Sequence, residues 1–420
     1  MLMPQPAIAA PAARLARRPL LAAALALGLA APACLIGLPS QARADSGSAA
    51  EGAAAGDAAV PQPKPTGRAR FTDPEDGQID LSRILEKPSG FLPIPLIVTE
   101  PAVGYGGGVV GMFLRPREEA GAEGWARPDI SAVGGLATEN GTWMALAGDS
   151  SRWLDGRLRT LVGGATGKIN LDFYGAGLDL PALDEGLSYS LRLSGALAQA
   201  NWQLAPKSPW SVGLRYVYSD VDSELKSAPL PPELAGRAAV RVSAPTAIVE
   251  YDSRDSVFTP TRGLYAETSY LASREALGAS VDFERFDQVL IGWWPLARSL
   301  TFGARGNYAW SSSGTPFFMR PFIALRGVPA MRYQGAEAAS VELEARWQFR
   351  GRWSVVPFVG AGTTHIDRTL APDSQSVGSG GVGFRYELAR KFGLHAGLDL
   401  AHSPGTTAVY FQVGNAWFRP

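Results

Sequence analysis

The sequence is poor in cysteine and has no excess of charge of either sign. Its 420 residues include one Cys, and 39 basic residues balance 39 acidic ones. One cysteine excludes a disulfide framework, a zinc cluster and an iron–sulfur centre. A chain without net charge lacks the basic surface that attracts nucleic acid, so we expect no nucleic-acid partner. Wholesale disorder is also excluded, because 46% of the residues are apolar.

Long apolar runs are missing as well, except for one near the start of the chain. Arg17 and Arg18 precede the apolar stretch 20–38, and the small residue Ala44 follows it closely. This order predicts a secretory signal peptide over residues 1–44. A retained membrane anchor and a lipidated cysteine are alternative interpretations of the same stretch. No run of 18 apolar residues follows it, so transmembrane helices are not expected.

The next segment, residues 45–70, is rich in Ala, Gly and Pro and has one large apolar residue, Val60. Such a segment cannot bury enough apolar surface to order itself, so we expect a disordered linker. Between the signal peptide and residue 91 we see no room for a folded periplasmic module. We therefore assign residues 71–102 to a periplasmic N-terminal segment that leads into the main domain.

Beyond residue 100, apolar and polar residues alternate along many short segments. In the segment 210–218, Trp210 and Leu214 fall on one face and Arg215 falls on the other. The same pattern occurs at 300–310, 341–349, 381–388 and 392–400. Alternation with a period of two predicts β-strands. Lysine is scarce on the polar faces, and aromatic residues gather near the ends of the apolar faces. Both features are typical of an outer-membrane barrel with a lipid-facing apolar band.

We predict an all-β fold, a transmembrane antiparallel β-barrel over residues 103–420, in the outer membrane of a bacterial cell. Counting the alternating segments gives sixteen strands, from 103–114 to 405–418. The even number, and the alternation of long and short connections, agree with a bacterial barrel. A count of fourteen stays open, because the Gly-rich segments 157–167 and 169–180 are weakly patterned.

Four motifs point to one known family. DSRDSVFTPTRG at 252–263 is similar to a strand-connecting turn, and LRG at 325–327 is similar to the tip of a lid loop. VELEARWQF at 341–349 is similar to a Glu-x-Arg strand, and FQVGNAW at 411–417 is similar to an aromatic-ended last strand. Together they resemble the BamA/TamA surface-antigen family of outer-membrane barrels, in its branch without POTRA domains. The resemblance implies that the connection 312–337 is a lid loop folded into the lumen.

The same resemblance suggests what the protein does and what it contacts. It implies insertion by the barrel assembly machinery, contact with outer-membrane lipid, and a function in handling lipid or other outer-membrane proteins. A passive channel is the alternative, because a polar lumen conducts unless a loop plugs it. A barrel-embedded lipid hydrolase is a third hypothesis, although no nucleophile–base pair stands out. We expect no enzymatic activity, no cofactor and no metal site.

The lid loop has a predicted anchoring group, Arg326 and Gly327. A guanidinium inside a lumen needs a carboxylate partner, and a glycine permits the tight turn behind it. Glu344 is the preferred partner on the polar face of the adjacent strand, and Glu342 is the second. The family pattern would also place an Asp on the following strand, where this chain has Gly360. We therefore expect Arg326 to be held less tightly than in relatives, unless it is simply solvated in an external loop.

The barrel must close where its first and last strands meet. We predict that 103–114 closes against 405–418, whose residues Phe411, Gly414 and Trp417 belong to the C-terminal strand. The first of these strands is rich in glycine, with Gly104, Gly106, Gly107, Gly108 and Gly111. Glycine weakens strand pairing, so these residues predict a seam that opens sideways. Close approach of neighbouring backbones is the alternative explanation for the glycines.

Overall fold

The structure is a computed structural model that covers six stretches of the chain. It describes residues 71–85, 90–115, 129–173, 187–225, 237–365 and 374–417. The predicted signal peptide (1–44) and linker (45–70) lie outside these residues. Within the six stretches, no helix is long and apolar enough to cross a membrane.

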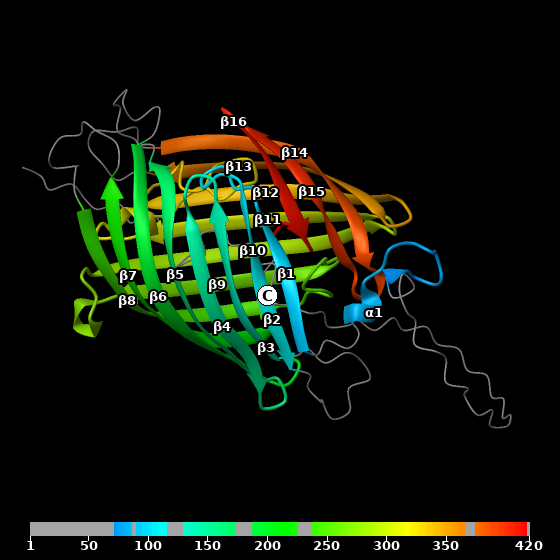
Figure 1. Cartoon of the computed structure of the whole chain (residues 1–420), viewed down its shortest axis with the longest axis horizontal. Helices are drawn as coiled ribbons and strands as arrows, with labels where there is room; N and C mark the ends of the chain where they lie inside the picture. The colour runs from blue at the N-terminus through cyan, green and yellow to red at the C-terminus, as the bar shows by residue number, and fades with distance from the viewer. Residues whose placement is uncertain are drawn as a thin grey trace, which may run out of the picture.

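Sixteen strands form one antiparallel sheet in which each strand pairs with its neighbours in the chain (Figure 1). The strands are β1 (Gly90–Val98), β2 (Gly106–Arg115), β3 (Asp129–Thr138), β4 (Trp143–Trp153), β5 (Leu158–Phe173), β6 (Leu187–Gln203), β7 (Trp210–Leu225), β8 (Arg237–Asp252), β9 (Gly263–Ser273), β10 (Phe283–Ala297), β11 (Leu300–Ser311), β12 (Glu337–Arg350), β13 (Trp353–His365), β14 (Ser374–Ala389), β15 (Leu394–Ser403) and β16 (Thr406–Val413). The helical elements among the described residues are α1 (Ser82–Leu85) and the 3-10 turns η3 (Glu275–Leu277), η4 (Phe317–Met319) and η5 (Arg390–Phe392). The predicted all-β barrel of sixteen strands is confirmed.

Two errors in the expected strand positions cancel in this count. Gly90–Val98 forms β1 and pairs with β2, although the sequence placed it in the periplasmic segment 71–102. Its sequence GFLPIPLIV does not alternate, so the period-two test missed it. Conversely, the expected strands 157–167 and 169–180 are one strand, β5, which stays paired with β6 through Lys168. The barrel therefore begins at Gly90.

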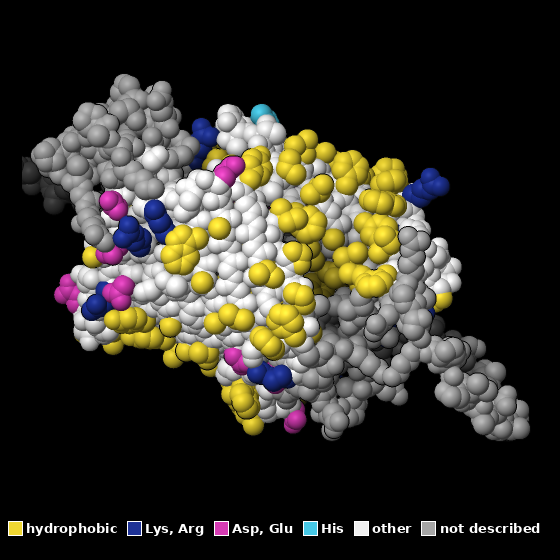
Figure 2. Space-filling view, viewed as in Figure 1, with side chains coloured by type: hydrophobic (Ala, Val, Ile, Leu, Met, Phe, Trp, Pro, Cys, Tyr) yellow, Lys and Arg dark blue, Asp and Glu magenta, His cyan; other side chains and the backbone are white. Residues whose placement is uncertain are grey.

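Alternation along the strands determines which side chains face outward. In β7, Trp210, Leu214 and Tyr218 are exposed, whereas Val217 and Ser219, on either side of Tyr218, are buried. Figure 2 shows hydrophobic side chains spread over much of the visible wall. A barrel wall in lipid needs apolar side chains only at every second position, because its backbone groups are satisfied by the neighbouring strands.

The loop 312–336, between β11 and β12, lies inside the barrel and is called the lid loop below. Ile323 and Leu325 of this loop are buried against Val377 of β14. Farther along the loop, Met331 packs against apolar side chains of β5 and β6. The lumen thus has an apolar core of its own, formed by the lid loop and the inner wall.

Candidate functional site

The tip of the lid loop places Arg326 among three carboxylates. Its Nε lies 2.9 Å from Glu342 Oε1, and its Nη2 lies 2.9 Å from Glu344 Oε2. Its Nη1 lies 2.9 Å from Asp399 Oδ2 on β15. The guanidinium also lies over the ring of Phe358, with 3.6 Å between Cζ and the ring centroid. All four charged side chains are buried, so pairing and hydrogen bonding must offset their loss of hydration. We call this group the lid lock.

Gly327 forms the turn behind Arg326. Its φ of 87° lies in the left-handed region that glycine tolerates, and a Cβ at this position would lie 3.1 Å from the His402 backbone nitrogen. The Gly327 N–H donates to the Tyr410 hydroxyl at 3.0 Å, and its carbonyl accepts from the Ser403 hydroxyl at 2.7 Å. The turn is therefore fixed to β15 and β16 as well as to β12.

The carboxylate that the sequence seemed to lack comes from Asp399. Gly360 lies opposite Glu342 in the β12–β13 ladder. A Cβ at position 360 would lie 2.7 Å from Leu325 Cδ2, so the lid loop occupies that space. Asp399 reaches Arg326 from β15 and also lies 2.5 Å from Arg385 Nη1. Sequence analysis missed this role, because polar residues on the inner face of a strand carry no information about the register that brings them together.

The last residues of the described chain belong to the lid lock rather than to the final strand. β16 ends at Val413, and Gly414, with a φ of 82°, turns the chain back into the barrel. Trp417 is 3% exposed, and its Nε1 donates to Glu342 Oε1 at 2.6 Å. The expectation that Trp417 ends the C-terminal strand is therefore wrong. Phe411 does lie in β16 and is exposed.

Asn415 holds this returning segment in place. Its N–H donates to the Phe258 carbonyl at 2.6 Å, and its side-chain amide donates to the same oxygen at 2.8 Å. Phe258 belongs to the turn 253–262, which lies within the DSRDSVFTPTRG motif (252–263). Two motifs that the sequence identified separately thus meet at the end of the chain.

The glycines assigned to the seam are not at the seam. Gly104 lies in a turn, and the other four lie in β2, which is paired with β1 on one side and β3 on the other. A Cβ at Gly106 would lie 2.2 Å from the Ala137 carbonyl oxygen. A Cβ at Gly111 would lie 2.4 Å from the Phe91 ring. Close approach of neighbours therefore explains these glycines, and the expectation of a Gly-rich edge strand is wrong.

The two ends of the sheet are β1 and β16, and no ladder joins them among the described residues. The Leu96 carbonyl oxygen lies 3.2 Å from the Cβ position of Gly107, so the backbone groups of Leu96 point toward β2. Alternate residues point the opposite way, which directs Pro93 and Pro95 toward the open edge. Proline has no N–H to donate, so this edge lacks two of the donors that a closing ladder would use.

Comparison with known proteins supports the fold. No protein-family model and no curated protein matches the sequence. BamA from Haemophilus ducreyi lacking POTRA domains 1–3 matches with a TM-score of 0.54 and 13% identity, over 78% of this chain and 70% of that one. CdiB from Escherichia coli matches with a TM-score of 0.53 and 10% identity, over 79% and 60%. CdiB from Acinetobacter baumannii matches with a TM-score of 0.52 and 10% identity, over 77% and 59%.

The chain folds as an outer-membrane barrel of the BamA type. The motif resemblance predicted this fold, which is confirmed. The chain spans about three fifths of the length of the two CdiB chains. At identities of 10–13%, the likeness concerns the path of the backbone and not particular side chains.

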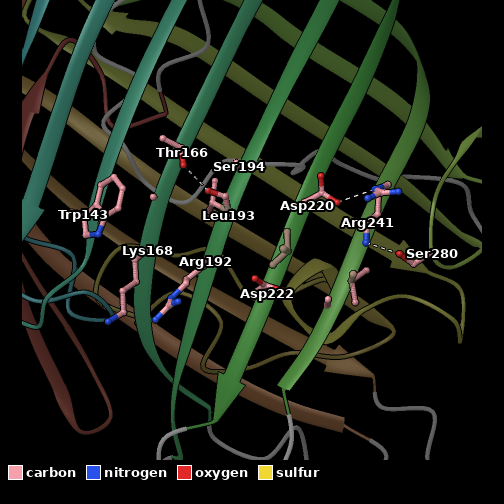
Figure 3. Close-up of a pocket in the computed structure, with 14 residues that line it drawn as sticks. Trp143, Thr166, Lys168, Arg192, Leu193, Ser194, Asp220, Asp222, Arg241 and Ser280 are labelled. Carbon is pink, nitrogen blue, oxygen red and sulfur yellow. Dashed lines mark hydrogen bonds and ion pairs between the residues drawn. The ribbon is translucent and has the colours of Figure 1, made fainter.

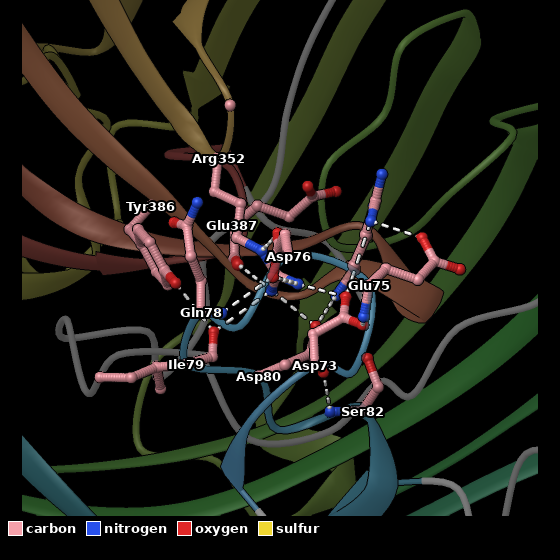
Figure 4. Close-up of polar contacts among 12 residues, drawn as sticks. Asp73, Glu75, Asp76, Gln78, Ile79, Asp80, Ser82, Arg352, Tyr386 and Glu387 are labelled. Carbon is pink, nitrogen blue, oxygen red and sulfur yellow. Dashed lines mark hydrogen bonds and ion pairs between the residues drawn. The ribbon is translucent and has the colours of Figure 1, made fainter.

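A second arginine group of this BamA-type barrel lies where the described chain enters the barrel (Figure 4). Arg352, in the turn between β12 and β13, is 2% exposed. Its Nε lies 2.6 Å from Asp76 Oδ2, and its Nη1 lies 2.6 Å from Asp80 Oδ2. Its Nη2 contacts Asp73. These three aspartates belong to the segment 71–85, which we call the strap.

Backbone contacts also fix the strap to the barrel. The Leu81 N–H donates to the Leu388 carbonyl at 2.8 Å, and the Tyr386 hydroxyl donates to the Ile79 carbonyl at 2.8 Å. The strap therefore lies against the turns at this end of β12–β15. Sequence analysis left this segment without a role, and its close run of acidic residues was the one available signal.

Proposed function

We propose that this protein acts in the outer membrane in handling other outer-membrane proteins or lipid, by coupling release of the lid loop to opening between β1 and β16. The observation that carries this proposal is the shared position of Glu342. It binds the lid through Arg326 and the end of the chain through Trp417. One carboxylate thus links the lid to the segment that directly follows the edge strand β16.

The chemistry of the lid lock supports a lid with two discrete states, bound and released, over a lid that only stabilises the barrel. Arg326 holds its three carboxylates at hydrogen-bond distance inside a lumen, where breaking one pair leaves an uncompensated buried charge. Such a group favours one discrete arrangement strongly, and its release requires that all of the charges find new partners or water. Release of Arg326 would leave Glu342 without its cation. The hydrogen bond between Glu342 and Trp417 would then no longer be held in place by the lid.

The open edge supports sideways opening. Pro93 and Pro95 direct no donors across the gap to β16, so separating the two strands would break few backbone hydrogen bonds. An edge of this kind is a liability in water, because it invites pairing with another chain. In a membrane, the same property would let an incoming strand or lipid enter between β1 and β16.

Disulfide crosslinking tests the proposal. The single native cysteine, Cys34, lies within the predicted signal peptide, so introduced pairs would be the only thiols of the processed chain. We would place one cysteine in β1, at Ile94 or Leu96, and one in β16, at Ala408, which leaves the Tyr410 contact to the lid intact. Oxidised pairs are expected to reproduce the deletion phenotype, measured as an altered outer-membrane protein and lipid profile, and a reductant should reverse it. Crosslinked protein that functions normally would refute sideways opening.

Single-channel conductance distinguishes the proposed function from the alternative, a passive channel. The lid loop and the side chains that it contacts occupy the lumen, so the wild-type chain in a planar bilayer should show no stable open pore. A long-lived conducting state of the wild-type chain, together with an unchanged membrane profile in a deletion strain, would favour the channel.

A further inference from the structure

Charged side chains gather on the wall of β5–β8, near the end of the barrel that carries the longer loops. Lys168 on β5 lies directly opposite Arg192 on β6, and Trp143 on β4 lies directly opposite Lys168. Farther round the wall, Asp220 on β7 lies opposite Arg241 on β8. Together these side chains line a cavity of about 690 Å³ (Figure 3). Figure 2 shows charged side chains concentrated at this end of the wall.

Alternation shows that this cavity opens outward and not into the lumen. Lys168 shares its face of β5 with Val162, which is 55% exposed. Its neighbour Ile169 is 1% exposed and packs with the apolar residues inside the barrel. On β6, Arg192 likewise follows Leu191, which is buried on the inner face. The cavity therefore lies on the surface that faces the membrane.

Aromatic residues place the cavity at the level of the lipid headgroups. Trp143 and Trp153 stand at the two ends of the 11-residue strand β4, and both are exposed. This separation suits an apolar band of roughly 25 Å with an aromatic girdle at each edge. Tyr218 is also exposed, and Arg241 lies over its ring at 5.9 Å from the centroid. Lys168, opposite Trp143, is therefore at the interface and not in the apolar band.

The cations of the cavity differ in their pairing. Arg241 is already held by Asp220, with 2.8 Å between Nε and Oδ1. Asp222, opposite Arg192 in the ladder, has an interaction of its own. Lys168 and Arg192 have neither an ion-pair partner nor a side-chain hydrogen bond within the part of the chain that the structure describes. Among the described residues, these two neighbouring positive charges thus face the interface without a protein acceptor.

We propose that Lys168 and Arg192 bind a phosphate group on the headgroup of a glycolipid in the outer leaflet. A guanidinium offers paired N–H groups to phosphate oxygens, and the adjacent ammonium adds a compact charge. The Trp143 ring suits the boundary between headgroup and acyl chain, and the apolar wall around Val162 would lie along the acyl chains. Short turns of bacterial barrels face the periplasm and longer loops face outward, which places this end in the outer leaflet. The site shares no residue with the lid lock or with the β1–β16 edge.

Native mass spectrometry of the full chain in detergent tests this site, with bisphosphorylated lipid A and its fully dephosphorylated form as probes. The variant Lys168→Gln/Arg192→Gln should bind the phosphorylated lipid roughly tenfold more weakly than the wild type. It should bind the dephosphorylated lipid as the wild type does. The control Lys207→Gln/Arg298→Gln removes two exposed cations from turns at the opposite end and should leave both affinities unchanged.

Heat-modifiable migration on a gel checks that each variant is folded, and the single variants Lys168→Gln and Arg192→Gln replace the double variant if it is not. Equal affinity of the wild type and the cavity variants for the phosphorylated lipid would overturn the proposal. An equal loss in the control variant would also overturn it. Displacement of the lipid by an equal concentration of inorganic phosphate would indicate a free-anion site and refute the assignment to a lipid.

Discussion

Trp417 donates a 2.6 Å hydrogen bond to the same Glu342 oxygen that accepts from the lid residue Arg326. The end of the described chain and the tip of the lid loop therefore meet at one carboxylate. Trp417 follows β16 by only a few residues. A movement of this edge strand would therefore reach the lid through two hydrogen bonds, Trp417 to Glu342 and Arg326 to Glu342.

Replacing Arg326 by Ala should destabilise the barrel. The change leaves Glu342 and Glu344 buried without their main cation, which typically costs about 3–5 kcal/mol. We expect heat-modifiable migration to be lost at a lower temperature than in the wild type. Arg326→Lys keeps the charge but not the forked donor geometry. Its migration should be lost at a temperature between those of Arg326→Ala and the wild type. Unchanged migration of Arg326→Ala would mean that the lid lock does not contribute to stability.

Trp417→Phe should loosen the lid without emptying the space that the ring fills. A hydrogen bond to a charged group contributes about 1.5–3 kcal/mol, and phenylalanine retains most of the apolar contact. Faster protease cleavage of the lid loop in intact, folded barrels is the expected readout. The exposed residue Trp153 gives a matched control, because Trp153→Phe removes an indole N–H from the outer wall. Equal cleavage rates for the wild type and Trp417→Phe would exclude coupling through this bond.

The position of the third carboxylate can be tested by moving it from β15 to β13. Asp399→Asn should destabilise the barrel, because Arg326 and Arg385 both lose an ionised partner. Adding Gly360→Asp should not restore stability, because Leu325 occupies the space beside position 360. Adding Leu325→Ala as well should restore part of it. Rescue by Gly360→Asp alone would show that the lid adapts more readily than the packing implies.

The strap should detach in acid. The hydrogen bond from Arg352 is the largest cause of the lowered pKa of Asp76. Burial raises the pKa of Asp80, but hydrogen bonds from Ser82 and Arg352 outweigh it, and this pKa is lowered as well. The ionised carboxylates therefore stabilise the docked strap fully above the ordinary value of 3.8, and this contribution is lost as the pH falls through the lower folded values.

Spin labels at positions 78 and 351 can measure this detachment. We expect the distance between the labels to lengthen in the wild type well below pH 4 and to stay short near pH 6. In Arg352→Gln the distance should already be long near neutral pH. Arg298 is an exposed cation in the turn between β10 and β11 at the same end of the barrel, so Arg298→Gln serves as the matched control. A distance independent of both pH and Arg352 would refute the role of the aspartates.

Glu100, in the connection between β1 and β2, should make lid docking sensitive to pH in the opposite direction. Burial raises the pKa of this carboxyl, while hydrogen bonds from the Ala330 and Ala102 N–H groups oppose the shift. Ionised Glu100 is therefore disfavoured in the docked state, and docking should tighten as the pH falls from the raised pKa of docked Glu100 toward the ordinary value of 4.5. Glu100→Gln keeps an acceptor for the Ala330 N–H and should remove this dependence, measured by the rate of lid cleavage. A variant with the same pH profile as the wild type would contradict the assignment.

The sequence alone was sufficient for the fold class, because alternation is a local property. A strand that separates lipid from a lumen must place apolar side chains at every second position, so each strand carries its own evidence. Two strands, β1 and β5, did not follow this pattern, and each has a physical reason. β1 does not alternate because its inward-facing residues Leu96 and Val98 join apolar clusters while Ile97 faces outward, so both of its faces are apolar. β5 was divided in two because its glycines give a weak pattern. The lid residues Arg326 and Gly327 were also identified, because a short motif marked them.

What only the tertiary structure decided was which residues meet. Asp399, on β15, reaches a lid residue 73 positions away in the chain, and it does so through the register of the sheet. The sequence assigned Trp417 to the last strand, but in the structure it belongs to the lid lock, because the turn at Gly414 directs it inward. The glycines of β2 proved to be places of close contact and not a weak edge. A period of two tells which face a side chain occupies, but the closing of the sheet tells what lies across the lumen from it.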